Sequence, residues 1–93
     1  MIQSFGCKET QKIFNREYSK KLPPDIQDMA FRKLRMLNRS CVIDDLRIPP
    51  SNHLEKLKGD KKGIYSIRIN NQWRICFIWK DGHSYDVRIV DYH

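Results

Sequence analysis

The segment KGDKKGIYSIRINNQWRICFIW, residues 58–79, decides the fold that this sequence predicts. Apolar and polar residues alternate on both sides of Asn70 and Asn71, which indicates two β-strands, and Asn tolerates the positive φ of a short hairpin loop. The alternation puts isoleucines and aromatic residues on one face and Arg68 and Arg74 on the other. We therefore expect a sheet with one face packed on helices and a cationic open face suited to a polyanion.

Two amphipathic helices are predicted before this hairpin. The first extends over residues 8–18, where Glu9 and Lys12 form an i,i+3 pair. The second runs over residues 24–38 and begins with Pro24, which suits the first position of a helix. Its basic side chains, Lys33 among them, are expected on the side opposite its apolar stripe. The apolar stripe consists of Ile26, Met29, Ala30, Leu34 and Leu37.

Further strands complete the expected sheet. We expect strands at residues 2–5, 54–58 and 85–90, a turn at Asp81-Gly82, and one helical turn near residues 42–46. In the last strand, Tyr85, Val87 and Ile89 should share one face. The 93 residues predict a single α+β domain, with an N-terminal strand and two helices packed on one face of a mainly antiparallel twisted sheet.

The charge balance narrows the class of partner. Eighteen Lys and Arg residues against eleven Asp and Glu residues give a net charge of +7 and a pI of about 9.5. Such a balance favours nucleic acid, an anionic membrane surface or an acidic protein, although ordinary solubility also explains it. No apolar run is long enough for a signal peptide or a membrane span, so we expect a cytoplasmic protein without membrane contact.

The sequence contains no motif for common hydrolytic sites. It has no phosphate-binding loop, no HExxH and no GxSxG, and the three cysteines lack the spacing of a zinc site or a disulfide framework. We therefore expect no metal and no cofactor. Cleavage of RNA without a metal needs a base, an acid and cations around the phosphate. Residues that could fill these roles are Glu55, Lys58, Arg68, Arg74 and His93.

The sequence resembles the HigB-type toxins, or plasmid-maintenance killer proteins, of the RelE/ParE superfamily. The resemblance rests on MIQSF at residues 1–5, on PPSNHLEKLKGDKKGIYSIRINNQWRICFIW at 49–79, and on VRIVDYH at 87–93. It implies a RelE-like toxin that enters the ribosomal A site and cuts mRNA by attack of a 2′-hydroxyl. It also implies a toxin–antitoxin hetero-oligomer, in which a HigA-type antitoxin with a helix-turn-helix keeps the toxin silent.

The resemblance also implies which positions are catalytic. They are Lys58, Arg74, Asp91, Tyr92 and His93. His93, with an unperturbed pKa of about 6.5, suits a general acid or base, Tyr92 suits stacking on a base of the RNA, and Asp91 suits orienting His93 or Arg74. Lys58 is expected to hold a phosphate oxygen or to act as a base, unless it is an ordinary surface lysine.

Four further residues are candidates for binding the substrate: Glu55, Lys61, Arg68 and Arg88. Some relatives carry a histidine where this chain has Glu55, so the identity of the base stays open among Glu55, Lys58 and His93. Glu55 is also interpreted as a salt-bridged strand residue, and His53 as structural or solvent-facing.

Two other functions remain open at this stage. ParE-like relatives share the fold and act by binding a target such as DNA gyrase, without cleaving RNA. A plain basic module that binds RNA or DNA is the third interpretation, although the chain lacks a recognition-helix or aromatic RNP signature.

Overall fold

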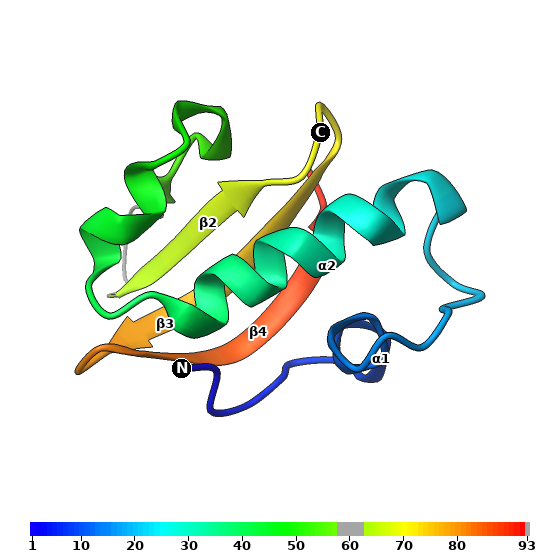
Figure 1. The fold of residues 1–93 in the computed structure, drawn as a ribbon, viewed down its shortest axis with the longest axis horizontal. Helices are drawn as coiled ribbons and strands as arrows, with labels where there is room; N and C mark the ends of the chain where they lie inside the picture. The colour runs from blue at the N-terminus through cyan, green and yellow to red at the C-terminus, as the bar shows by residue number, and fades with distance from the viewer. Residues whose placement is uncertain (58–62, 93) are drawn as a thin grey trace.

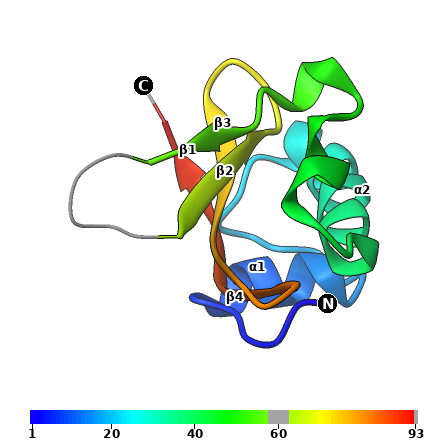
Figure 2. The ribbon, with the colours of Figure 1, turned by 90° about the vertical axis from the view of Figure 1, so that its left-hand side faces the viewer.

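A four-stranded antiparallel sheet with helices on one side forms the architecture of the computed structural model, which describes residues 1–57 and 63–92 (Figure 1). The strands lie in the order β1-β2-β3-β4. In Figure 2 the helices lie to the right of the sheet, and no described helix covers the opposite, open face. The predicted α+β architecture is therefore confirmed. In chain order the elements are α1 (Lys8–Phe14), α2 (Pro24–Arg39), the 3₁₀ helices η1 (Ile43–Arg47) and η2 (Pro50–Asn52), and the strands β1 (Glu55–Lys56), β2 (Ile64–Arg68), β3 (Trp73–Lys80) and β4 (His83–Asp91).

The core lies between the sheet and α2. Ile67, Ile75, Phe77 and Val87 are almost completely buried on the helix-facing side of the sheet, as the alternation predicts. From α2, the residues Ile26, Ala30, Leu34 and Leu37 face them, again at the predicted spacing. Met29, by contrast, is exposed.

Helix α2 begins at Pro24 and ends one residue beyond the predicted boundary. Lys33 is the main departure, because only 7% of its surface is exposed. Its ammonium donates a hydrogen bond to Oδ1 of Asn52 in η2. The prediction of a solvated Lys33 was therefore wrong, because a polar partner from a later segment covers that part of the helix.

Helix α1 is shorter than predicted and ends at Phe14. Sγ of Cys7 accepts a hydrogen bond from the N–H of Thr10 at 3.4 Å and begins the helix. Arg16 adopts a left-handed φ of 62°, which stops the helix there, and Tyr18 is consequently 62% exposed. The predicted pair between Glu9 and Lys12 forms, with 3.5 Å between Oε2 and Nζ.

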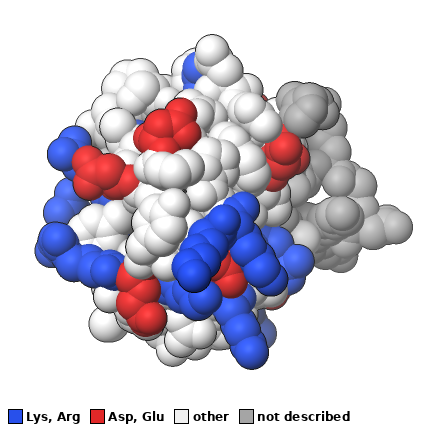
Figure 3. Space-filling model, turned by 90° about the vertical axis from the view of Figure 1, so that its right-hand side faces the viewer, with Lys and Arg blue, Asp and Glu red and all other residues white. Residues whose placement is uncertain are grey.

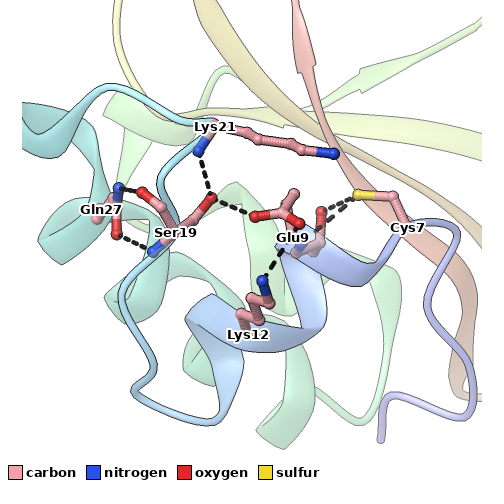
Figure 4. Close-up of polar contacts among 7 residues, drawn as sticks. Cys7, Glu9, Lys12, Ser19, Lys21 and Gln27 are labelled. Carbon is pink, nitrogen blue, oxygen red and sulfur yellow. Dashed lines mark hydrogen bonds and ion pairs between the residues drawn. The ribbon is translucent and has the colours of Figure 1, made fainter.

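A polar network joins α1 to the segment that precedes α2 (Figure 4). The hydroxyl of the fully buried Ser19 donates to Oε1 of Glu9 at 2.5 Å. The amide of Gln27 exchanges hydrogen bonds with the backbone of Ser19, accepting at 3.1 Å and donating at 2.8 Å. These bonds give buried polar groups their partners and hold the two helices together.

The loop between β2 and β3 differs from the predicted two-residue turn. Arg68 is paired with Arg74, and the N–H groups of Ile69 and Asn70 both donate to the carbonyl of Trp73. Oδ1 of Asn70 accepts from the N–H groups of Gln72 and Trp73, both at 2.8 Å. The hydrogen bonds of the Asn70 side chain therefore shape the loop. Asn70 and Asn71 do not adopt the positive φ that we expected.

The loop between β3 and β4 is the predicted two-residue turn. Asp81 and Gly82 have φ values of 52° and 80°. Two consecutive positive φ values are the geometry that matches the twist of a hairpin.

Strand β4 is longer than predicted and contains a bulge. Asp86 has a φ of 53°, and the pairing shifts between Cys76 and Ile78 of β3. Tyr85 is therefore opposite Ile78 and shares its face. The expectation that Tyr85 shares a face with Val87 was wrong, because the extra residue of the bulge reverses the alternation.

Two other strand predictions were too long. The N-terminal segment makes only isolated parallel bridges, from Ile2 to Ser84 and from Phe5 to Val87. The strand expected at residues 54–58 is limited to Glu55–Lys56 in the part of the chain that the structure describes.

Candidate active site on the open face of the sheet

Arg74 is the centre of the candidate site. It lies on β3 next to Ser66 of β2, and only 7% of its surface is exposed. Nε donates to Oγ of Ser66 at 2.9 Å, and Nη2 donates to the carbonyls of His53 and, at 3.4 Å, Ser66. A buried guanidinium needs such partners because an unpaired buried charge costs several kcal/mol, about 3–5 when one partner is removed.

Glu55 of β1 lies beside the remaining nitrogen of Arg74. Oε1 of Glu55 is 3.6 Å from Nη1 of Arg74, and the Glu55 side chain is 52% exposed. The interpretation of Glu55 as a salt-bridged residue is therefore confirmed. The carboxylate neutralises part of the Arg74 charge while staying accessible to a ligand.

The C-terminal residues reach the same place. The guanidinium carbon of Arg74 lies 5.6 Å from the ring centroid of Tyr92, which is within the range of a cation–π contact. The N–H of Tyr92 donates to the carbonyl of Gln72, and Nε2 of Gln72 lies 3.2 Å from Oδ2 of Asp91. The loop between β2 and β3 therefore holds the end of β4 next to Arg74.

The other two arginines of the open face have partners of their own. Nη2 of Arg88 donates to both carboxylate oxygens of Asp86, at 2.7 and 2.8 Å, and this ion pair raises the pKa of Arg88. Arg68 donates to Oδ1 of Asn71. Arg68 is directly opposite Arg74, as the predicted shared face requires.

A cavity of about 440 Å³ lies on the open face of the sheet, lined by residues of β2, of the middle of β3 and of β4. Leu57, Ile64, Ile78 and Val90 give it an apolar floor, while Arg88, Asp91 and Tyr92 supply polar and aromatic groups. Such a mixture of an apolar floor and a few polar groups is typical of a ligand site.

In the part of the chain that the structure describes, the open face is less cationic than predicted. Arg74 is buried and paired, and Arg88 is neutralised by Asp86. In Figure 3, Lys and Arg side chains gather in a band across the lower part of the side that carries α1. Exposed basic residues of α1, α2 and the segment between them are Lys8, Arg16, Lys20, Lys21, Arg32, Arg35 and Arg39.

Three of the predicted site residues, Lys58, Lys61 and His93, lie outside the described residues. Of the others, the structure brings Arg74, Glu55 and Tyr92 together. Tyr92 also lines the cavity of the open face, together with Asp91 and Arg88. Within residues 1–57 and 63–92, no group of three His, Cys, Asp or Glu side chains is arranged to hold a metal. No helix of this part is long and apolar enough to cross a membrane.

Four residues that shape the site had no catalytic or binding role in the sequence prediction. Ser66 and the carbonyl of His53 hold Arg74, Gln72 holds the C-terminal end, and Asp86 pairs with Arg88. Ser66 and Asp86 carried a signal in the sequence, because the alternation puts Ser66 on the same face as Arg74 and Asp86 on the same face as Arg88. The interpretation of His53 as structural or solvent-facing agrees with its exposed side chain and bonded carbonyl.

Comparison with solved structures defines the class of fold. The chain superimposes on a crystal structure of a YafQ point mutant from E. coli with a TM-score of 0.62 and 13% identity, covering 98% of this chain and 91% of the other. It superimposes on the YoeB–YefM complex from Staphylococcus aureus with a TM-score of 0.59 and 21% identity, covering 100% and 98%. The fold is therefore that of the RelE-like toxins.

Sequence comparison then identifies the family. Residues 3–93 match the family described as the RelE-like toxin of the type II toxin–antitoxin system HigB, and the chain belongs to that family. Endoribonuclease HigB of Proteus vulgaris is 30% identical over 93 residues, the full length of both chains. Toxin HigB-1 of Vibrio cholerae is 48% identical over 61 residues, which span 66% of this chain and 64% of that toxin. The resemblance stated from the sequence is confirmed.

Proposed function

We propose that this protein is a ribosome-dependent mRNA interferase, an endoribonuclease toxin that acts as one domain of residues 1–93. The observation that carries the proposal is Arg74, a buried guanidinium held by Ser66 and His53 and in contact with Glu55 and Tyr92 beside an open cavity. Membership of a family that includes a protein named Endoribonuclease HigB supports it.

In the proposed reaction, a base removes the proton of a 2′-hydroxyl, and the 2′-oxygen forms a bond to the adjacent phosphorus. The bond from phosphorus to the 5′-oxygen breaks, an acid donates a proton to that oxygen, and a 2′,3′-cyclic phosphate remains. Nη1 of Arg74 is the nitrogen that faces the half-exposed Glu55, so it is available to a phosphate oxygen that displaces the carboxylate. Loss of one such charge at the transition state costs about 2.7–4 kcal/mol.

The remaining roles follow from the chemistry of the side chains. Lys58 binds the phosphate or acts as the base, His93 is the general acid or base, and Glu55 is the third candidate for the base. Asp91 orients His93 or Arg74. Tyr92, 40% exposed above the Arg74 guanidinium, stacks on a base of the mRNA.

The RNA is expected to continue over the cavity of the open face. Arg88, which Asp86 orients, contacts the RNA backbone there, and Arg68 and Lys61 extend the contact along the sheet. No metal takes part.

The proposed partners are a HigA-type antitoxin and the ribosomal A site, in the cytoplasm. A toxin with a net charge of +7 is expected to bind an acidic surface of its antitoxin. The fold is shared with a chain of the YoeB–YefM toxin–antitoxin complex, which supports a hetero-oligomer of the same kind.

The test is primer extension on a reporter mRNA in a reconstituted translation reaction, with and without ribosomes. Wild-type protein is compared with Arg74→Ala and His93→Ala, and with Arg47→Ala as a matched control, since Arg47 is exposed and pairs only locally with Asp44. We expect cuts within the reading frame that need ribosomes, disappear in Arg74→Ala and His93→Ala, and persist in Arg47→Ala.

Other outcomes are informative. Cuts that persist in His93→Ala would move the proton transfer to Lys58 or Glu55. The absence of cuts with folded wild-type protein would overturn the proposal in favour of a ParE-like toxin that binds DNA gyrase, for which DNA breaks in growing cells are the expected sign.

A further inference from the structure

The position of Arg74 depends on a backbone carbonyl that is outside the sheet. His53 accepts a hydrogen bond from Nη2 of Arg74, and it follows directly on the 3₁₀ helix η2. Its backbone is left-handed, with a φ of 43° and a ψ of 56°. Because a histidine adopts this conformation only when its surroundings hold it there, the neighbours of His53 decide where its carbonyl points.

Asn52 is the neighbour that fixes this segment. Its side chain is completely buried, and Nδ2 donates to the carbonyl of Leu46 at 3.0 Å and to Sδ of Met36 at 3.1 Å. Its own N–H donates to the carbonyl of Pro49 at 3.0 Å. Asn52 thus joins η1, η2 and α2 at the residue before His53.

Lys33 completes the arrangement from α2. Its ammonium donates to Oδ1 of Asn52, and burial lowers the pKa of Lys33. A buried ammonium is costly, and an apolar side chain of similar length would fill the same space without that cost. A role for the buried ammonium would explain why this cost is tolerated. That role is to hold the Asn52 amide in one orientation.

We propose that Asn52 and Lys33 are positioning residues for Arg74. Through the backbone at His53 they fix the carbonyl that holds Nη2, and so they leave Nη1 directed at Glu55 and the substrate. The importance of this for catalysis rests on the proposed role of Arg74 in cleaving RNA. The structural link between Asn52 and Arg74 does not depend on that role.

The first experiment measures the link without any substrate. The Nη–Hη signals of Arg74 are assigned in a ¹⁵N NMR spectrum by their loss in Arg74→Lys, and the exchange of the Nη2 protons with solvent is measured in Asn52→Ala and Lys33→Met, because Nη2 donates to the His53 carbonyl. We expect exchange at least about tenfold faster in both variants, because the guanidinium loses a fixed acceptor. Leu37→Ala is the control, since it empties a buried site on α2 and leaves the hydrogen bonds of Asn52 in place.

Lys33→Met provides the test if Asn52→Ala does not fold. An unchanged Arg74 signal in the folded Lys33→Met variant, or an equal change in Leu37→Ala, would overturn the proposal.

The second experiment separates positioning from general stability. Cleavage by folded protein is measured for Asn52→Ala alone and in combination with Arg74→Ala. We expect a loss of about tenfold to a hundredfold in the first case, since a misplaced catalytic group has effects of this size, and no further loss in the second. If Asn52→Ala lowers the cleavage rate by the same factor in the presence and in the absence of the Arg74 side chain, the proposal is contradicted. If Arg74→Ala itself cuts normally, the proposed role of Arg74 fails, while the exchange measurement still decides whether Asn52 and Lys33 position it.

Discussion

Arg74 and Tyr92 form a cation–π contact, in which the guanidinium carbon lies over the face of the ring, 5.6 Å from its centroid. The two residues come from β3 and from the end of β4, and the bond between Tyr92 and Gln72 keeps them together. A ring that is 40% exposed above a buried cation can stack on an RNA base with its free face.

The effect of replacing Tyr92 on RNA binding should therefore depend on whether the new side chain keeps an aromatic ring. Tyr92→Ala should weaken binding of RNA about fivefold to 150-fold, since stacking on one base contributes about 1–3 kcal/mol. Tyr92→Phe keeps the ring and should bind RNA almost as the wild type does. Fluorescence anisotropy with a labelled single-stranded RNA measures this, and equal losses in the two variants would show that the hydroxyl matters instead of the ring.

Replacement of Glu55 tests whether this carboxylate is the base. It is half-exposed and paired with Arg74, so its contribution to stability should be that of a surface ion pair, about 0.2–1 kcal/mol. We expect Glu55→Gln to reduce the cleavage rate less than about fivefold. A loss of about a hundredfold or more in a single-turnover cleavage assay would instead assign Glu55 as the base.

Two glycines should respond differently to alanine. Gly82 has a φ of 80°, and an added Cβ would meet the carbonyl of Cys41 at 3.1 Å, so Gly82→Ala should destabilise the protein by about 1–2 kcal/mol. At Gly6 the atoms nearest to an added Cβ would be side-chain atoms of Asp86 and Arg88, at 2.5 and 2.6 Å, and these exposed side chains can move. Gly6→Ala should therefore cost at most about 1 kcal/mol, mainly by displacing that exposed ion pair. Urea unfolding measures the free energy of unfolding of both variants. A larger decrease for Gly6→Ala than for Gly82→Ala would contradict the prediction.

Acid stability should depend on Glu9. The hydrogen bond from Ser19, together with Lys12, lowers the pKa of Glu9 from 4.5 in spite of partial burial. A carboxylate with a lowered pKa in the folded state stabilises the protein fully above pH 4.5, and this contribution is lost as the pH falls below that value. Glu9→Gln should therefore show a weaker decrease of the free energy of unfolding over this range.

Ser19→Ala should reproduce much of that effect, because it removes the main cause of the lowered pKa. Urea unfolding between about pH 3 and pH 6 measures both variants. If the free energy of unfolding of both variants depends on pH as that of the wild type does, the hydrogen bond between Ser19 and Glu9 does not stabilise the fold.

The amino-acid sequence by itself determined the helix α2, the pairing of β2 with β3, the turn at Asp81-Gly82 and most of the core. These features depend on residue spacing along short segments, such as the alternation from Ile67 to Phe77 and the helical stripe from Ile26 to Leu37. Local spacing is enough because each segment buries one face whatever its partner is. The same spacing put Arg68, Ser66 and Arg74 on one face of the sheet.

Only the tertiary structure decided how the polar residues are used. Lys33 and Arg74 are buried because Asn52 and His53, which precede β1, supply acceptors for them. The bulge at Asp86 reverses the alternation of β4 and puts Tyr85 on the face of Ile78 instead of the face of Val87. The burial of a charge depends on a partner that is distant in the sequence, and spacing along one segment does not contain that information.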